Sequence, residues 1–141
     1  MMESIKLNLI PFPPSVNSAY AHFRDRSGTI RRCKSPAVLD WNGKFYAWEL
    51  VNRHEVRNAK NLLQTLNGLI GMKFAFRMSK QRLFTLKGTP KKLDLSNHIK
   101  ILEDSITGLL GFDDSLVFKL EAEKIPHEKK SSWVDLEIFS L

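Results

Sequence analysis

Apolar and polar residues alternate in several short stretches of the chain, and each of these stretches predicts a strand. Ile5, Leu7 and Leu9 alternate with polar neighbours, and the prolines of PFPP end the strand because proline cannot donate to a ladder. Two short strands are expected around the turn Asp25–Gly28. Further alternating strands are predicted at 70–78, 116–123 and 134–138.

Two other stretches repeat with the period of a helix. Ser35 followed by Pro36 is a typical helix start, and an apolar stripe with helical spacing follows it: Val38, Trp41, Phe45 and Trp48. This helix could continue or restart through 56–66. The second helix is expected from Leu95 to about Leu109, with a predicted buried stripe of Ile99, Leu102, Ile106 and Leu109. The pattern predicts an α+β fold with a mixed, mostly antiparallel sheet and two main helices.

The length, charge and cysteine content of the chain limit the classes of protein to which it can belong. A chain of 141 residues fits a single domain spanning 1–141. Lys and Arg number 22 against 15 acids, and this net charge of +7 favours a polyanionic partner, most often nucleic acid. The single cysteine, Cys33, excludes an internal disulfide and a cysteine-rich zinc site. Since we find neither an apolar signal segment nor a membrane-length apolar run, we expect a cytoplasmic protein without a membrane partner.

Acidic residues nevertheless gather between Lys91 and Val117. Taken singly, each has a structural explanation: Asp94 could cap a helix, Lys100 and Asp104 could form an ion pair, and Asp113-Asp114 could form a turn. Taken together, they favour a site for Mg²⁺, because this hard cation binds carboxylate, water and phosphate oxygens. Such a metal would let a basic protein place acids beside DNA. The candidate ligands are Asp94, Asp104, Asp113 and Asp114.

Three motifs resemble the RusA family of Holliday junction resolvases, which are often encoded by phages and prophages. They are PFPPSVNSAY near the N-terminus, DLSNHIKILED in the centre, and GFDDSLV followed by the late lysine of EKIP. The resemblance extends from about Ile5 to the end of the chain. It implies a homodimeric, Mg²⁺-dependent endodeoxyribonuclease that resolves four-way junctions by phosphodiester hydrolysis in DNA recombination and repair, with Mn²⁺ as a possible substitute.

The resemblance also assigns roles to individual residues. It implies that Asp94, Lys100 and Asp114 are catalytic, with Asp94 and Asp114 as metal ligands and Asp113 beside them. One departure is Ser96, which stands where the family usually has a second aspartate. Either Asp104 or Asp113 compensates for the lost charge, or the metal binds more weakly. The alternative function is therefore a protein that binds branched DNA and cuts it weakly or not at all.

DNA contacts are expected from the basic residues of the hairpin around Asp25–Gly28 and of the segment 79–92, which is predicted to be a basic loop. Such contacts to phosphates are strong, salt-sensitive and blind to sequence. The candidates are Arg24, Arg26, Arg31, Arg32, Lys34, Lys91 and Lys92. Phe84 is the aromatic candidate for contact with unpaired bases. A basic RNA-binding or ribosome-associated protein is the second alternative, and it would show no metal effect.

Overall fold

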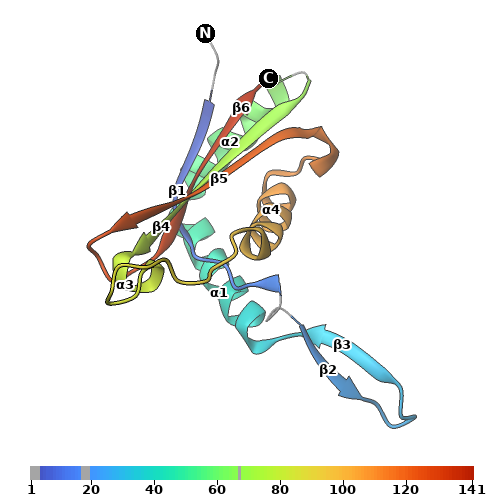
Figure 1. The fold of residues 1–141 in the computed structure, drawn as a ribbon. Coiled ribbons are helices and arrows are strands. Elements are labelled where there is room, and N and C mark those ends of the chain that lie inside the picture. Colours follow the sequence, from blue (N-terminus) through green and yellow to red (C-terminus); the bar gives the residue numbers. More distant parts are fainter. Residues whose placement is uncertain (1–3, 17–19, 67) are drawn as a thin grey trace.

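The hydrophobic core is built on strand β4 (Ile70–Ser79), in which Ile70, Met72, Phe74, Phe76 and Met78 are all buried. Every second side chain therefore faces the core, as the alternation predicted. The computed structural model in Figure 1 describes residues 4–16, 20–66 and 68–141. Residues 17–19 of the PFPPSVNSAY motif lie outside the described residues.

Four strands form the main sheet in the order β1-β6-β4-β5. Strand β1 (Ser4–Pro11) pairs antiparallel with β6 (Trp133–Ser140), and β6 pairs antiparallel with β4. Strand β5 (Val117–His127) runs parallel to β4 and forms one edge. A connection between parallel neighbours requires a crossover, and helix α4 (Ser96–Leu110) lies within it. The α+β class and the mixed, mostly antiparallel sheet are confirmed.

Four helices accompany the sheet in the described part of the chain, and the two predicted helical stretches account for three of them. The first predicted helix divides into α1 (Pro36–Val51) and α2 (Arg53–Thr65) at Asn52. The amide nitrogen and the side-chain nitrogen of Asn52 both donate to the Trp48 carbonyl, which closes α1. A single turn, α3 (Lys80–Leu83), interrupts the segment that was predicted to be a basic loop.

The tryptophans of α1 are core residues, as their spacing indicated. Trp41 and Trp48 are buried, and Phe45 stacks between them. Their indole nitrogens donate to the backbone oxygens of Pro11 and Asn8, which fastens α1 to the end of β1.

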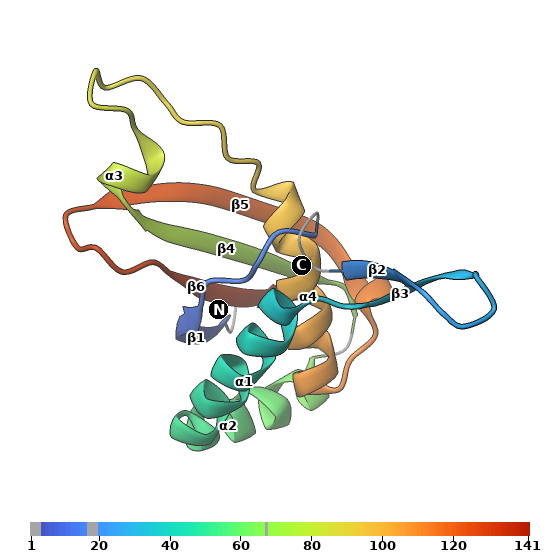
Figure 2. The ribbon, with the colours of Figure 1, turned by 90° about the horizontal axis from the view of Figure 1, so that it is seen from below.

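A two-stranded arm projects from this body. Strands β2 (Tyr20–Arg24) and β3 (Ile30–Lys34) pair antiparallel and extend away from the sheet and helices in both views (Figures 1 and 2). Most of its side chains are exposed, and it packs on neither face of the sheet. An isolated two-stranded ribbon is only marginally stable in water, so the stability of this arm depends on its turn and on what it binds.

Three expectations about burial are corrected. Leu9 is 63% exposed with a φ of 58°, because a bulge in β1 shifts the apolar alternation to Ile10. The buried stripe of α4 keeps Leu102 and Ile106, but it includes His98 and Leu110 where Ile99 and Leu109 were expected. Leu116, just before β5, and Phe118 and Leu120 within it are exposed, because this edge of the sheet is left uncovered.

Candidate active site and DNA interface

Asp94 ends the loop that precedes α4, and the first residue of that helix fixes its carboxylate. Its Oδ1 atom accepts hydrogen bonds from the Ser96 amide at 3.0 Å and from the Ser96 hydroxyl at 2.6 Å. Such a local turn orders the aspartate side chain. Asp94 is exposed, and within the described residues its Oδ2 atom accepts no hydrogen bond. One carboxylate oxygen of Asp94 is therefore available to a ligand.

Hydrogen bonds from Ser96, with a smaller effect of nearby basic groups, keep Asp94 ionised. The two hydrogen bonds from Ser96 lower the pKa of Asp94, and the charges of His98 and Lys124 lower it further. Lys124 belongs to β5, so this edge strand brings its charge back toward the start of α4. The sequence interpretation had matched Lys124 only to a motif, and it had missed His98 as a neighbour of this aspartate.

The N-terminal motif supports the start of α4 through His98. The buried His98 ring lies edge-on to Phe12 at 5.1 Å, and its Nδ1 atom hydrogen-bonds the Pro13 carbonyl at 2.9 Å. The guanidinium of Arg82 covers Phe12 at 4.2 Å. The sequence PFPP therefore does more than end β1, because it also holds the helix that follows Asp94.

Lys100 and Asp104 form an ion pair on the exposed face of α4. The Lys100 Nζ atom donates to Asp104 Oδ1 at 2.9 Å. This hydrogen bond raises the pKa of Lys100, and the charges of Asp104, Glu103 and Asp114 add to the effect. Lys100 therefore stays protonated, with acidic groups from two motifs around it.

The two aspartates of the second acidic motif, Asp113 and Asp114, make different contacts. Asp113 precedes a short 3₁₀ turn (Asp114–Leu116), and it accepts a hydrogen bond from the Ser115 amide at 2.9 Å. This bond and a second one to Ser115 lower the pKa of Asp113. Asp114 is exposed and affects the pKa values of Lys100 and Glu103. Glu103 was not among the predicted site residues, and burial raises its pKa.

Each structural alternative raised by the sequence is present: a local turn at Asp94, an ion pair at Lys100 and a cap at Asp113. Together they leave one oxygen of Asp94 open and Asp114 exposed beside α4. No group of three His, Cys, Asp or Glu side chains gathers as a metal site within residues 4–16, 20–66 and 68–141. The donors still suit Mg²⁺, which protein sites commonly bind through one or two carboxylates, with water and substrate phosphate completing the shell.

The helix separates some of the candidate ligands. Asp104 lies eight residues after Ser96 (96 to 104), and a helical rise places it about 12 Å along α4 from the end of the helix that Asp94 precedes. One Mg²⁺ ion, which needs ligands near 2 Å, cannot be reached by both side chains at that separation. Asp104 is positioned instead to hold Lys100.

The predicted basic hairpin is present, and one carboxylate holds its turn. Asp25 accepts hydrogen bonds from the Ser27 and Thr29 amides, the Ser27 hydroxyl and the Arg31 guanidinium. These bonds lower the pKa of Asp25 to about 2, with the Ser27 hydroxyl and Arg31 contributing most. The turn is therefore ordered at neutral pH.

The basic residues of the arm differ in how they are engaged. Arg31 pairs with Asp25, and the Arg32 guanidinium lies 4.1 Å from the centre of the Tyr20 ring. Arg24, Arg26 and Lys34 form no ion pair with any residue that the structure describes. These three side chains are the ones most available to phosphates.

The second basic segment surrounds α3 and leads to Asp94. The Lys91 ammonium donates to the Gln81 carbonyl at 2.7 Å, whereas Lys92 is exposed. Lys80 pairs with Glu128, and burial lowers the pKa of Arg82. Of the two predicted DNA contacts here, Lys92 is the more available to phosphate.

Comparison with known families agrees with this arrangement. A family model described as Endodeoxyribonuclease RusA matches residues 11–138, which is most of the chain. No curated protein matches the chain. No described helix is long and apolar enough to cross a membrane. The family match thus defines the class of protein as an endodeoxyribonuclease, an enzyme that cuts within DNA strands.

The chain belongs to the RusA family of Holliday junction endodeoxyribonucleases. Its substrate class is accordingly a DNA junction, and its cellular context is recombination and repair. Nucleases of this family generally depend on a metal.

Proposed function

We propose that this chain hydrolyses phosphodiester bonds at four-way junctions with a site built from Asp94, Lys100 and Asp114. The observation that supports the proposal is that the second acidic motif lies close enough to α4 for Asp114 to act on Lys100. Asp94 enters the helix, Lys100 stands on its exposed face, and Asp114 influences the pKa of Lys100 from the next motif. Both aspartates are exposed and can be reached by a phosphate.

Asp94 and Asp114 are the proposed holders of Mg²⁺, with Asp113 positioning the turn that presents Asp114. A bound divalent ion supplies Lewis-acid polarisation of the phosphate and a more acidic water. The donor chemistry supports this assignment, because both groups are carboxylates and Asp94 has an open oxygen. Mn²⁺ also suits carboxylate and water ligands, and we propose it as a substitute.

The remaining side chains act on charge and orientation. Lys100 is protonated and can neutralise negative charge that builds on the phosphate in the transition state. Asp104 holds the Lys100 ammonium through the 2.9 Å bond. Ser96 donates to Oδ1 of Asp94 and so restrains this carboxylate. Ser96 therefore contributes a restraint where the usual family residue contributes a charge.

A cleavage assay tests this function. A labelled four-way junction is incubated with the chain in Mg²⁺, in Mn²⁺ and in a chelator. We expect cuts near the branch point with either ion and none with the chelator. Lys100→Ala should slow cleavage by about 10²-fold, the usual size of lost electrostatic stabilisation. If Lys100→Ala cuts junctions as fast as the wild type, Lys100 has no catalytic role and serves only in a surface ion pair.

A second candidate function rests on Ser96. With serine at this position the site has one negative charge fewer, and Mg²⁺ affinity depends on ligand charge. The chain would then hold junctions and cut them poorly. Tight junction binding with no cleavage in either metal would support this alternative.

We propose further that the active form is a homodimer. The substrate has four arms around one branch point, and a two-fold dimer suits two symmetric cuts. The open edge of β5 supports this proposal. Phe118 is 67% exposed and lies where the register of this edge strand shifts against β4. Leu116 and Leu120, on either side of Phe118 in the sequence, are also exposed. Exposed apolar edges favour pairing with another chain.

A further inference from the structure

The loop between α3 and α4 contains a tight turn that presents one apolar side chain to solvent. Leu86 has a relative exposure of 109%, so neither face of its side chain is covered. The turn beneath it is ordered. The Thr85 amide donates to the Thr89 carbonyl at 2.8 Å, and the Gly88 amide donates to the Thr85 carbonyl at 2.9 Å. Because this turn holds Leu86 in solvent, the leucine side chain contributes no burial energy to the stability of this chain.

The same turn geometry occurs at the tip of the β2–β3 arm. There the Asp25 amide donates to the Thr29 carbonyl and the Gly28 amide to the Asp25 carbonyl, both at 3.0 Å. Gly28 and Gly88 have φ values of 83° and 82°, a conformation that glycine adopts without strain. The residue after the first turn position is Arg26 in the arm and Leu86 in the loop. Two matched turns therefore carry different tips, one cationic and one apolar.

The surroundings of Leu86 are those of a DNA contact. The segment 80–92 contains five basic residues and no acid: Lys80, Arg82, Lys87, Lys91 and Lys92. An apolar tip in a basic setting matches duplex DNA, in which charged phosphates flank stacked, apolar base faces. Proteins that kink DNA insert apolar side chains such as leucine between base steps.

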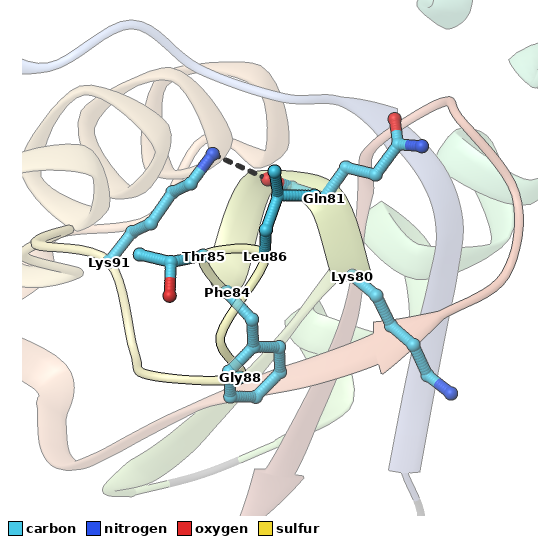
Figure 3. A pocket seen from close by; sticks show the side chains of 7 residues that line it. All are labelled: Lys80, Gln81, Phe84, Thr85, Leu86, Gly88 and Lys91. Atoms are coloured by element: carbon cyan, nitrogen blue, oxygen red, sulfur yellow. Dashed lines mark hydrogen bonds between the residues drawn. The ribbon is translucent and has the colours of Figure 1, made fainter.

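A hollow of about 620 Å³ lies beside this turn, between Phe84 and the lysines Lys80 and Lys91 (Figure 3). Figure 3 shows Lys91 reaching back to the Gln81 carbonyl, whereas Lys80 extends from the opposite side of the loop. An aromatic ring in a basic setting can stack a base. The hollow thus offers a place for a base displaced from the stack.

We infer that Leu86 is a wedge that enters the base stack at the branch point of the junction, with the hollow beside Phe84 receiving the displaced base. The inference rests on the proposed cleavage of four-way junctions and adds the residue that distorts the substrate. Only Lys91, Lys92 and Leu93 separate Pro90, the end of this turn, from Asp94. A wedge here therefore acts close in the chain to the proposed metal ligand.

The test uses a four-way junction carrying 2-aminopurine beside the branch point, whose fluorescence rises when the base leaves the stack. Divalent ions are withheld so that no strand is cut. We expect the wild-type chain to raise the fluorescence, Leu86→Phe to keep the rise, and Leu86→Ser to lose most of it. In Mg²⁺, Leu86→Ser should cut about tenfold more slowly, because unstacking is no longer supported.

Val51→Ser is the matched control, since Val51 is 84% exposed at the end of α1, outside the basic segments. It should behave as the wild type in both assays. If Leu86→Ser opens and cuts the junction like the wild type, the wedge is overturned and the proposed function stands. If the wild-type chain binds no junction, the proposed substrate fails and the wedge fails with it.

Discussion

At the scale of single residues, the hydrogen bond between Ser96 and Asp94 changes how this site is interpreted. Serine at this position looks like a lost ligand in the sequence, yet its hydroxyl lies 2.6 Å from Asp94 Oδ1. The bond lowers the pKa of Asp94 and occupies one of its two carboxylate oxygens. The effect of Ser96 on activity is thus a balance between a missing charge and an added restraint.

The proposed ligands can be tested by removing charge without adding bulk. Asp94→Asn and Asp114→Asn should each reduce junction cleavage to background while binding stays equal or tighter, because a repulsive carboxylate is lost near phosphate. Cleavage and gel-shift assays measure the two properties. Asp40→Asn is the control, since Asp40 is an exposed acid paired with Lys44 on α1. Wild-type cleavage by either site variant would exclude that residue as a ligand.

The pKa of Asp94 gives a prediction about pH. Asp94 must be ionised to bind a metal, and the Ser96 bonds depress its folded pKa below the ordinary value of 3.8. Activity that depends on this carboxylate is therefore retained above that pKa and lost as the pH falls through it. Ser96→Ala removes the hydroxyl bond, so the acid limb of the cleavage profile should move to higher pH. An unmoved acid limb would show that Ser96 does not control Asp94.

Ser96→Asp tests the missing charge. If the site lacks a negative ligand, this variant should need less Mg²⁺ for half-maximal cleavage, because ligand charge sets the affinity. Titrating cleavage against Mg²⁺ measures the requirement. Activity that stays flat or falls at every Mg²⁺ concentration would show that no charge is missing.

At the scale of elements, we propose that the arm and the loop after β4 carry the basic charge that contacts DNA. Replacing Arg24 and Arg26 by alanine should lower the salt dependence of junction binding by about two phosphate contacts. Replacing Arg31 and Arg32 should have a mixed effect, since Arg31 also supports the turn through Asp25. Binding measured over a range of salt concentrations gives both slopes. Slopes equal to the wild type in both variants would place the DNA on the loop around Lys92.

Much of the element pattern could be predicted from the sequence. The central strand, the Asp25–Gly28 turn and helix α4 follow from local period and turn chemistry, which depend on near neighbours. The exposed side of β5 could not be predicted, because its alternating apolar residues resemble those of a buried strand. Whether Phe118 is covered depends on the strand order, and that order is set by contacts far apart in the chain.

At the scale of the whole molecule, the uncovered β5 edge predicts self-association. Phe118→Lys should yield a monomer by sedimentation, because a charge replaces the apolar contact at the proposed dimer surface. On a supercoiled plasmid with a cruciform, it should give single nicks where the wild type gives paired cuts. Leu39→Lys, at an exposed apolar position of α1, is the control and should remain dimeric. A dimeric Phe118→Lys variant would place the interface elsewhere.

The sequence by itself determined the class of fold, the acidic motifs and the residues that carry the candidate chemistry, because periodicity, turn residues and motif spacing are local properties. Only the tertiary structure decided which groups meet. It placed Lys124 near Asp94 and Asp114 near Lys100, buried His98 against PFPP, and separated Asp104 from Asp94 along the helix. The positions of Lys124 and Asp114 depend on how the chain returns beside α4 in a parallel edge strand, and no local pattern in the chain specifies that path.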